Sequence, residues 1–509
     1  MKFKNILTLM LLFTATLCTQ SCSDDDSRNV ATDLVVTMDT TKVESITFAS
    51  TPAYRLIGIH SDGDWAVSVP TSDSAWIHIT PHSGYGHAVY KAENDSLNTY
   101  VRINVDRNDG TDRTSTVTVV AGAFTKVINV TQKGIAANDP FNSANDFVDK
   151  AVLGYNLGNT LDADPGNPQW WLDKLAACTT SADSIKAYET SWGQPVTTQK
   201  IIDDITAKGF NVIRVPVTWG AHLDANNKID KAWMDRVQEV VDYVIKDSCY
   251  CIINVMHDTG SKGDDPSTAG NKAWLYADID AYPTQTVKYQ AIWQQIAERF
   301  KDYDEHLVFE SFNEILNKSY SWTVPTDVND GAYQAINKLQ QDFVNTVRAT
   351  GGNNTYRNLG ITTYAATANS DVAVNALEVP TDPTTGHIYA TFHSYDPYNF
   401  CNSNKGTKDG VAYDYNIYSW DSSCETSIDE IFTRVNTRCN TLGIPYIFGE
   451  FGAIDENKDM NERVKYASYL GSKFKTYNTT GLWWMGLYNR STNTWSEERI
   501  VNALLNAVK

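Results

Sequence analysis

The sequence predicts two folded domains, a small all-β immunoglobulin-like sandwich followed by an α/β domain of the (β/α)8 TIM-barrel class. The chain has 509 residues, more than one ordinary domain holds. Residues 35–133 alternate polar and apolar side chains between frequent turns, whereas residues 140–509 repeat a strand, a loop and a helix. Hydrophobic residues make up 42% of the chain and charged residues 20%, as in folded globular proteins.

The N-terminal segment predicts an exported protein. Lys2 and Lys4 precede the apolar run ILTLMLLFTATLC, which is too short to span a membrane comfortably, so residues 1–21 are interpreted as a signal peptide. Cys22 follows a small residue and opens an acidic linker over residues 22–34. The stretch TQSCSDDD resembles a bacterial lipoprotein cleavage site joined to the export signal of Bacteroidetes lipoproteins. This resemblance implies a lipid on Cys22 that anchors the protein to the outer membrane, at the cell surface.

Residues 35–133 carry five short alternating runs, DWAVSV, AWIHIT, YVRINVDR, STVTVVAG and KVINVTQ, separated by turn sequences. The domain contains no paired carboxylates or clustered histidines, so we assign it no chemistry. WIHITPHSG, RNDGTDR and the closing VTQKG resemble the BACON domain of Bacteroidetes glycosidases. The resemblance leaves two roles open. One is carbohydrate binding by His60, His78, His82 or Trp65, and the other is a spacer that lifts the next domain off the membrane.

A linker at residues 134–139 leads into a region where predicted strands and helices alternate. TTQKIIDDITAKG, for example, is typical of a helix with Thr197 as its N-cap and Gly209 as its stop. A doubly wound sheet is the alternative, but no predicted strand is followed by a glycine-rich phosphate loop. Eight strands that alternate with helices predict a closed barrel. The predicted strands span residues 152–159, 211–219, 250–258, 306–314, 358–366, 387–395, 445–453 and 481–489.

Charge and cysteine spacing exclude some partners. Acidic residues outnumber basic ones by 61 to 42, for a net charge of −19, which argues against nucleic acid as a partner. The cysteines lack the spacing of a zinc site, although Cys401 and Cys424 could form a disulfide in an oxidising compartment. We expect no metal, no organic cofactor and a monomeric protein.

Polar and aromatic side chains close most of the predicted barrel strands. The active site of such a barrel lies where the carboxyl ends of the strands meet the loops. Buried polar groups cost stability unless they are paired, so several such strand ends at one rim predict a functional site. The residues concerned are Arg214, Trp219, His257, Asp258, Asn313, Glu314, His393, Tyr395, Glu450, Trp483 and Trp484.

Glu314 and Glu450 end predicted strands on opposite sides of the barrel mouth. Two carboxyl groups are the minimum equipment for glycoside hydrolysis, since one must protonate the leaving oxygen while the other attacks the anomeric carbon as an anion. We expect Arg214 and Tyr395 to hold Glu450 as the anion, and Glu314 to stay protonated beside the neutral Asn313. Asn313 could bind the sugar hydroxyl next to the anomeric carbon.

Residues 140–509 resemble glycoside hydrolase family 5, whose members are retaining enzymes with catalytic glutamates on strands four and seven. The motifs GYNLGNTLDA, ETSWGQPVTT, GFNVIRVPVTW, FESFNEI, FHSYDP, IFGEFGA and WWMG match in order and spacing. The resemblance implies that Glu314 is the acid/base and Glu450 the nucleophile. It implies in addition that the residues around the sugar are Arg214, Asn313, His393, Tyr395 and Trp484.

Two positions depart from the family pattern. Met256 stands where a histidine is usual, so only the second histidine, His257, remains, and a thioether cannot replace the hydrogen bond of an imidazole. Because neighbours on a strand alternate faces, we expect Met256 to form an apolar surface near the cleft and His257 to contribute less than His393. WWMG also lacks the usual aspartate. Trp484 is the predicted sugar platform, with Trp483 as the alternative.

GYNLGNTLDA and ETSWGQP resemble the cellulase and xyloglucanase branches of the family, which predicts endo-acting cleavage of β-1,4-glucan backbones of cellulose, mixed-linkage glucan or xyloglucan. β-Mannanase and xylanase stay open, because loops decide which substrate branches fit. A surface glycan-binding lipoprotein without turnover is an alternative that the presence of both glutamates disfavours. A metal-dependent hydrolase would need two histidines and an acid at ligand spacing. Tryptophans that could line the cleft are Trp170, Trp171, Trp192, Trp219 and Trp322.

Overall fold

The computed structural model describes residues 31–38, 41–48, 53–84, 99–106, 108, 112–132, 141–260, 273–384, 386–408, 411–454 and 458–509. The predicted signal peptide, Cys22 and the linker predicted at residues 134–139 lie outside this part of the chain. Within the described ranges, no helix combines the length and the apolar character that crossing a membrane requires.

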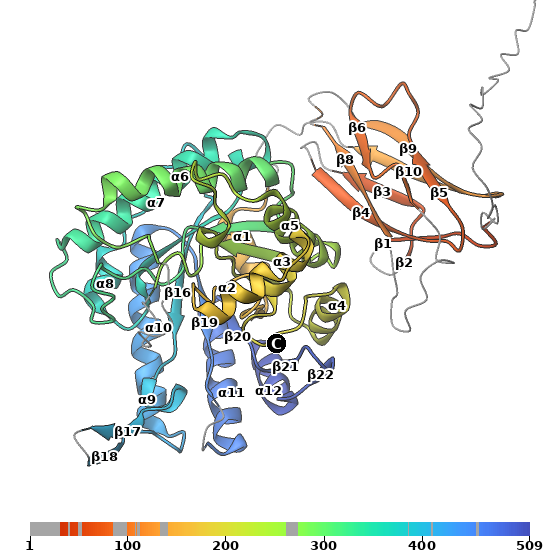
Figure 1. Cartoon of the computed structure of the whole chain (residues 1–509). Coiled ribbons are helices and arrows are strands. Elements are labelled where there is room, and N and C mark those ends of the chain that lie inside the picture. The colour runs from red at the N-terminus through yellow and green to blue at the C-terminus, as the bar shows by residue number, and fades with distance from the viewer. Residues whose placement is uncertain are drawn as a thin grey trace, which may run out of the picture.

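The N-terminal domain is a sandwich of two five-stranded sheets, which confirms the predicted all-β domain (Figure 1). The first sheet contains, in spatial order, β2 (Thr41–Lys42), β1 (Val35–Met38), β4 (Ala53–His60), β8 (Thr99–Val105) and β6 (Ile77–Thr80). The second contains β3 (Ser45–Phe48), β10 (Phe124–Gln132), β9 (Arg113–Ala121), β5 (Trp65–Ser68) and β7 (Ser83–Gly84). Buried and exposed side chains alternate along β5 and β6, and the buried ones of both sheets form one apolar core.

Trp65, a predicted candidate for sugar binding, belongs to this core. Its side chain is buried, and a Cβ atom on Gly84 would come within 2.2 Å of its indole ring. The tryptophan is therefore covered by its own sheet and cannot stack on a sugar. His60 and His82 are exposed, and Nε2 of His78 lies 3.0 Å from the Asp106 carboxylate on the surface.

The second domain is a closed barrel of parallel strands surrounded by helices, which confirms the predicted TIM barrel (Figure 1). Its strands follow one another as β11 (Gly154–Asn156), β12 (Val212–Val215), β13 (Tyr250–Asn254), β14 (Leu307–Glu310), β15 (Leu359–Thr367), β16 (Ile388–Ser394), β19 (Tyr446–Phe451) and β20 (Gly481–Trp484). Almost every strand residue is buried, because side chains fill the barrel on one face and helices cover the other.

The longer helices around the barrel bury one face, and several begin at a capping side chain, such as Asp230 and Asp421. Gly209 ends α4 in the left-handed conformation, with φ of 118°, while the N-cap is Thr198, one residue later than predicted. The helices are α1 (Ala144–Lys150), α2 (Gln169–Ala176), α3 (Ser181–Glu189), α4 (Gln199–Lys208), α5 (Lys231–Lys246), α6 (Tyr282–Phe300), α7 (Gly331–Ala349), α8 (Asp371–Ala376), α9 (Tyr398–Cys401), α10 (Ser422–Leu442), α11 (Met460–Thr476) and α12 (Glu498–Val508). Two hairpins, β17 (Lys405–Lys408) with β18 (Val411–Asp414) and β21 (Tyr488–Asn489) with β22 (Thr494–Trp495), complete the domain.

Most strands of the barrel end earlier than the apolar sequence predicts. β13 ends at Asn254 and β14 at Glu310, although the predicted strands continue to residues 258 and 314. The chain leaves the sheet where the strands diverge into loops at the mouth. His257 and Glu314 consequently stand in loops just beyond the strand ends, supported by the rigid barrel below.

The sandwich contacts the barrel beside α5, as Figure 1 shows. The hydroxyl of Tyr54 donates to Asp242 at 3.1 Å, and Arg55 forms an ion pair with Asp304 at 2.7 Å. The guanidinium of Arg102 lies 4.1 Å from the ring centre of Tyr54. Asp304 precedes β14, so the contact lies at the end of the barrel opposite the mouth.

The described cysteines, from Cys178 to Cys439, are all free thiols. The predicted disulfide between Cys401 and Cys424 is therefore wrong. Both are buried, and the thiol of Cys401 donates to the carbonyl oxygen of Asp396 at 3.2 Å. They fill the core as small apolar side chains.

Candidate active site

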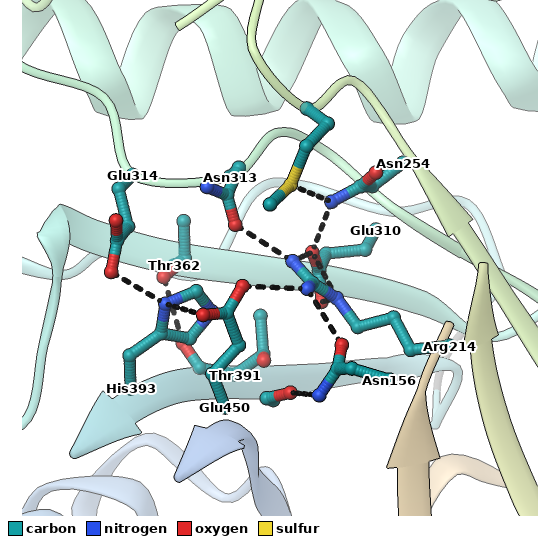
Figure 2. A network of polar contacts seen from close by, with 12 residues as sticks. Asn156, Arg214, Asn254, Glu310, Asn313, Glu314, Thr362, Thr391, His393 and Glu450 are labelled. Carbon is teal, nitrogen blue, oxygen red and sulfur yellow. Dashed lines mark hydrogen bonds and ion pairs between the residues drawn. The ribbon is translucent and has the colours of Figure 1, made fainter. Parts of the chain in front are cut away.

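The barrel brings most of the predicted strand-end residues together at its mouth (Figure 2). Arg214 comes from β12, Asn313 and Glu314 follow β14, His393 belongs to β16, and Glu450 belongs to β19. All except Glu314 are buried, and every one makes a polar contact with another member of the group.

Arg214 is the centre of this network. A guanidinium group has five N–H donors, and in Arg214 each of them has an acceptor. Nη1 donates to Glu450 at 2.8 Å and to Asn156 at 3.0 Å. Nη2 donates to Glu310 at 2.6 Å and to Asn313 at 2.8 Å, and Nε donates to Glu310 at 3.1 Å. Burial lowers the pKa of Arg214, but the Glu310 and Glu450 carboxylates outweigh that effect and raise it, so the side chain is a permanent cation.

Glu450 is held as predicted by Arg214 and Tyr395. The Tyr395 hydroxyl donates to Oε2 of Glu450 at 2.8 Å, while Arg214 holds Oε1. Burial raises the pKa of Glu450 above the ordinary value of a glutamate, and the charges of His393 and Arg214 together with the Tyr395 hydrogen bond oppose that rise. Glu450 thus accepts hydrogen bonds from two groups, the Arg214 cation and the Tyr395 hydroxyl, and both stabilise its carboxylate form inside the protein.

Glu314 faces Glu450 across the mouth and is the more exposed of the two. The exposed fraction of its side chain is 21%, against 6% for Glu450. Oε1 of Glu314 lies 2.8 Å from Nδ1 of His393, and an oxygen of Glu314 lies within 4.8 Å of an oxygen of Glu450. Burial lowers the pKa of His393, but the neighbouring Glu450 and Glu314 outweigh it and raise the pKa. The two carboxyl groups therefore differ in both solvent access and partners.

Of the two tryptophans that end β20, Trp484 faces the mouth. Trp483 is buried, and its ring packs edge-on against Phe451 at 5.3 Å, so it is a core residue. Trp484 is partly exposed and lies over Gly158, where a Cβ atom would come within 2.7 Å of the indole. A cavity of about 470 Å³ at the edge of the site is lined by Tyr395 and by both tryptophans, Trp483 and Trp484.

The third strand departs from the alternation that the sequence suggested. Met256 is buried, and its sulfur lies 3.7 Å from the amide nitrogen of Asn254, which also donates to Glu310, so Met256 packs against the polar network of the site. His257 is 25% exposed, with Nε2 3.6 Å from Asp162 and its ring 5.1 Å from that of Trp192. Burial lowers the pKa of His257, but Asp162 outweighs this and raises it, with smaller contributions from Glu450 and Glu314. The chain has left β13 at Asn254, so the alternation of a strand does not apply to Met256 and His257.

The other predicted strand-end and loop residues divide into structural and exposed ones. Asp258 accepts from the backbone N–H groups of Trp219 and Gly220, so it fixes a loop. Trp171 and Trp219 are buried, whereas Trp170 and Trp322 are more than half exposed. Of these predicted loop tryptophans, the two exposed ones and the partly exposed Trp192 can therefore offer a face to a ligand.

Three residues of the network were missed by sequence reasoning. They are Glu310, Asn156 and Asn254. Glu310 forms an ion pair with Arg214, Asn156 accepts a hydrogen bond from Arg214, and Asn254 donates to Glu310 at 2.9 Å. A signal was present for Glu310, because a charge closes the otherwise apolar strand Leu307–Glu310. Nothing in the sequence distinguishes the two asparagines from ordinary strand-end residues.

Comparison with known proteins agrees with this geometry. Residues 174–489 match the family model of cellulase, glycosyl hydrolase family 5, and residues 64–133 match BACON, a putative binding domain. Endoglucanase A of Ruminococcus albus is 34% identical over 72% of this chain and 93% of its own length.

Solved structures of family 5 enzymes are also similar to this chain. A family 5 enzyme from Prevotella bryantii, solved as a mutant with a xyloglucan tetradecasaccharide, is 35% identical with a TM-score of 0.62, over 72% of this chain and 99% of that one. A family 5 xyloglucanase from Bacteroides ovatus, solved with a heptasaccharide, is 26% identical with a TM-score of 0.59, over 94% of this chain and 100% of that one. The chain belongs to glycoside hydrolase family 5.

Proposed function

We propose that the protein is a retaining, endo-acting glycoside hydrolase that cleaves β-1,4-linked glucan backbones. The observation that carries this proposal is the pair Glu314 and Glu450, with oxygens within 4.8 Å of each other. Retaining glycosidases place their carboxyl groups about 5–5.5 Å apart, whereas inverting ones need about 6.5–9.5 Å to admit a water molecule. The short separation supports direct attack by one carboxylate.

In this mechanism Glu450 attacks the anomeric carbon while Glu314 protonates the departing glycosidic oxygen. The resulting glycosyl–enzyme ester is hydrolysed when Glu314 takes a proton from water. Arg214 and Tyr395 hold the two oxygens of Glu450, which fixes the attacking carboxylate in one orientation. Asn313 accepts from Arg214 through Oδ1, so its NH2 group is oriented to donate to a sugar hydroxyl.

The substrate class is supported by the relatives. Their names include endoglucanase, xyloglucanase and lichenase, which act on glucans with a β-linked backbone. The partly exposed Trp484 beside the cavity offers a flat apolar surface for a pyranose ring. We therefore expect hydrolysis of mixed-linkage β-glucan, xyloglucan or carboxymethylcellulose, with β-mannan and xylan as the alternative backbones.

One experiment tests the substrate and the mode of cleavage together. The purified protein is assayed on barley β-glucan, carboxymethylcellulose, xyloglucan, xylan and galactomannan, with viscosity and reducing ends followed in parallel. An endo-acting enzyme lowers viscosity well before reducing ends accumulate. Preference for xylan or galactomannan contradicts the glucan assignment, and binding without hydrolysis of any polymer favours the glycan-binding alternative. A product of inverted configuration by NMR excludes the retaining mechanism.

The proposed location is the outer face of the outer membrane, with a lipid on Cys22 and the sandwich as a spacer. The spacer role is supported by the contacts of Tyr54 and Arg55 with the barrel end opposite the mouth. Cys22 precedes the sandwich in the chain, so the sandwich separates the proposed anchor from the barrel along the sequence. The burial of Trp65 removes the aromatic candidate for carbohydrate binding by this domain.

A further inference from the structure

A third carboxylate, Glu310, lies beneath the proposed catalytic pair. It closes β14, its side chain is 1% exposed, and neither the attack nor the proton transfer described above uses it. A buried carboxylate is costly unless it is paired and hydrogen-bonded, so its presence below an active site calls for a physical reason.

Glu310 contacts a different edge of the Arg214 guanidinium from the one that holds Glu450. Glu310 accepts from Nε and Nη2 of Arg214, whereas Glu450 accepts from Nη1. Figure 2 shows the guanidinium between the two carboxylates. Asn254 donates a further hydrogen bond to Oε1 of Glu310 at 2.9 Å, and its own oxygen accepts the backbone N–H of Val217 at 3.2 Å. Glu310 is therefore itself held in place from the strand beside it.

This arrangement fixes the direction of the guanidinium. The group is planar, so anchoring Nε and Nη2 on Glu310 determines where the N–H bonds of Nη1 point. They point to Glu450 and Asn156. The same cation is also paired with two anions, so the negative charge of Glu310 offsets part of the positive potential that Arg214 creates at Glu450.

We propose that Glu310 is a positioning residue for the hydrolytic reaction. Glu310 orients the Arg214 guanidinium toward Glu450 and offsets part of the positive charge of Arg214, so that Glu450 is held as an anion yet stays reactive. This inference rests on the proposed function of Glu450. A glutamate in a buried ion pair elsewhere in the barrel would stabilise the fold but would not affect Glu450.

Charge sharing has a definite sign. The negative charge of Glu310 opposes that of Arg214, so its removal leaves the cation acting on Glu450 alone and lowers the pKa of Glu450. If Glu310 only oriented Arg214, its loss would let the cation move away and the pKa of Glu450 would rise. The titratable or charged groups that surround Glu450 and Glu310 are Arg214 from β12, His257 after β13, Glu314 after β14, and Tyr389, His393 and Tyr395 from β16 and its loop.

The test compares Glu310→Gln with the wild type in two ways. The pH profile of kcat/KM on the best glucan reports the ionisation of the nucleophile in the free enzyme. Titration of 13C-labelled glutamate carboxyls by NMR, with the Glu450 signal assigned by its loss in Glu450→Gln, reports the same ionisation without any substrate. We expect kcat to fall by about 10- to 100-fold, as when a partner behind a functional residue is lost. We also expect two shifts to lower pH, one in the acid limb of the kcat/KM profile and one in the NMR titration of Glu450.

A matched control is Glu189→Gln, which removes the charge from another buried Glu–Arg pair. Glu189 ends α3, is 1% exposed and lies 2.8 Å from Arg236, and its hydrogen bonds go to Arg236 and Thr197 and not to the Arg214 network. This variant is expected to lower Tm while the pH profile and the Glu450 titration stay unchanged. An unchanged or upward-shifted Glu450 titration in Glu310→Gln overturns the proposal. Because the titration needs no substrate, a wild type without glucanase activity would refute the proposed function separately.

Glu310→Asp keeps the proposal testable if the glutamine variant does not fold. It retains the charge but shortens the side chain by one carbon, so it cannot hold both Nε and Nη2 as Glu310 does. The acid limb is expected to stay close to that of the wild type while kcat falls. A folded Glu310→Asp with the kcat of the wild type overturns the positioning role.

Discussion

Nδ1 of His393 is hydrogen-bonded to Oε1 of Glu314 at 2.8 Å. The same nitrogen lies 3.7 Å from Oε2 of Glu450, so one imidazole stands between the two carboxyl groups. Because both acids raise the pKa of His393 against the effect of burial, the ring can carry a proton where negative charge is concentrated. The charge of His393 therefore affects Glu314 and Glu450 together.

Replacing either glutamate by glutamine is expected to lower kcat by about 10³-fold or more without unfolding the protein, because the amide can neither attack nor donate a proton in the same way. Glu314→Gln should retain much more activity on an aryl glycoside with an activated leaving group, which needs no protonation. Glu450→Gln should be inactive on both substrates. Equal losses for the two variants on the aryl glycoside would contradict the assigned roles, and circular dichroism checks the fold.

Tyr395→Phe is expected to move the acid limb of the kcat/KM profile to higher pH. The hydroxyl donates to Glu450 and so lowers the pKa of this carboxyl against the rise caused by burial. Without the donor that pKa rises further, and activity is lost at a higher pH as the nucleophile becomes protonated. A hydrogen bond to a charged group contributes about 1.5–3 kcal/mol, so we expect a loss of kcat of about 10- to 100-fold. An acid limb that stays in place would show that the hydroxyl does not support the anion.

His393→Ala is expected to lower activity more than His257→Ala on the same glucan. His393 is bonded to Glu314 and faces Glu450, whereas His257 is 3.6 Å from Asp162 and contacts neither glutamate directly. We expect a loss of about 100-fold for His393→Ala and about tenfold or less for His257→Ala. The opposite order would show that His257 has taken over the sugar contact expected of a histidine at the position that Met256 occupies.

Activity is expected to be unaffected by excess EDTA. Glu314, His393 and Glu450 place ligand atoms within 4.8 Å of one another, a spacing that could in principle hold a cation. In this site Glu450 is already neutralised by Arg214 and bonded by Tyr395, and Nδ1 of His393 is engaged with Glu314. A loss of activity with EDTA that Ca²⁺ or Zn²⁺ restores would favour a metal-dependent hydrolase.

The mature protein is expected to begin at Cys22 and to be removed from intact cells by added protease. Cys22→Ala should abolish lipid labelling and release the protein from the membrane fraction. A variant that stays membrane-bound and protease-accessible would contradict the lipoprotein assignment. The assay measures location only, so it is independent of the catalytic predictions.

The barrel and its rim could be predicted because both depend on local patterns. Apolar runs that alternate with amphipathic helices fold into parallel strands, and the fold then places every strand end at one mouth. Arg214, Asn313, Glu314, His393, Tyr395 and Glu450 were therefore found by position, and the structure brings them into one network.

What the sequence by itself determined is which residue types reach the mouth of the barrel. Only the tertiary structure decided how they pair. Glu310 lies 96 positions from Arg214 and Glu450 lies 236 positions from it, so nothing along the chain indicates that one guanidinium joins them. The same holds for Trp65 and the two free cysteines Cys401 and Cys424, whose sequence context suggested contacts that the packing does not form. Alternation and spacing of apolar residues predict the secondary structure of a segment. The partner of a buried side chain depends instead on which distant segment packs against it.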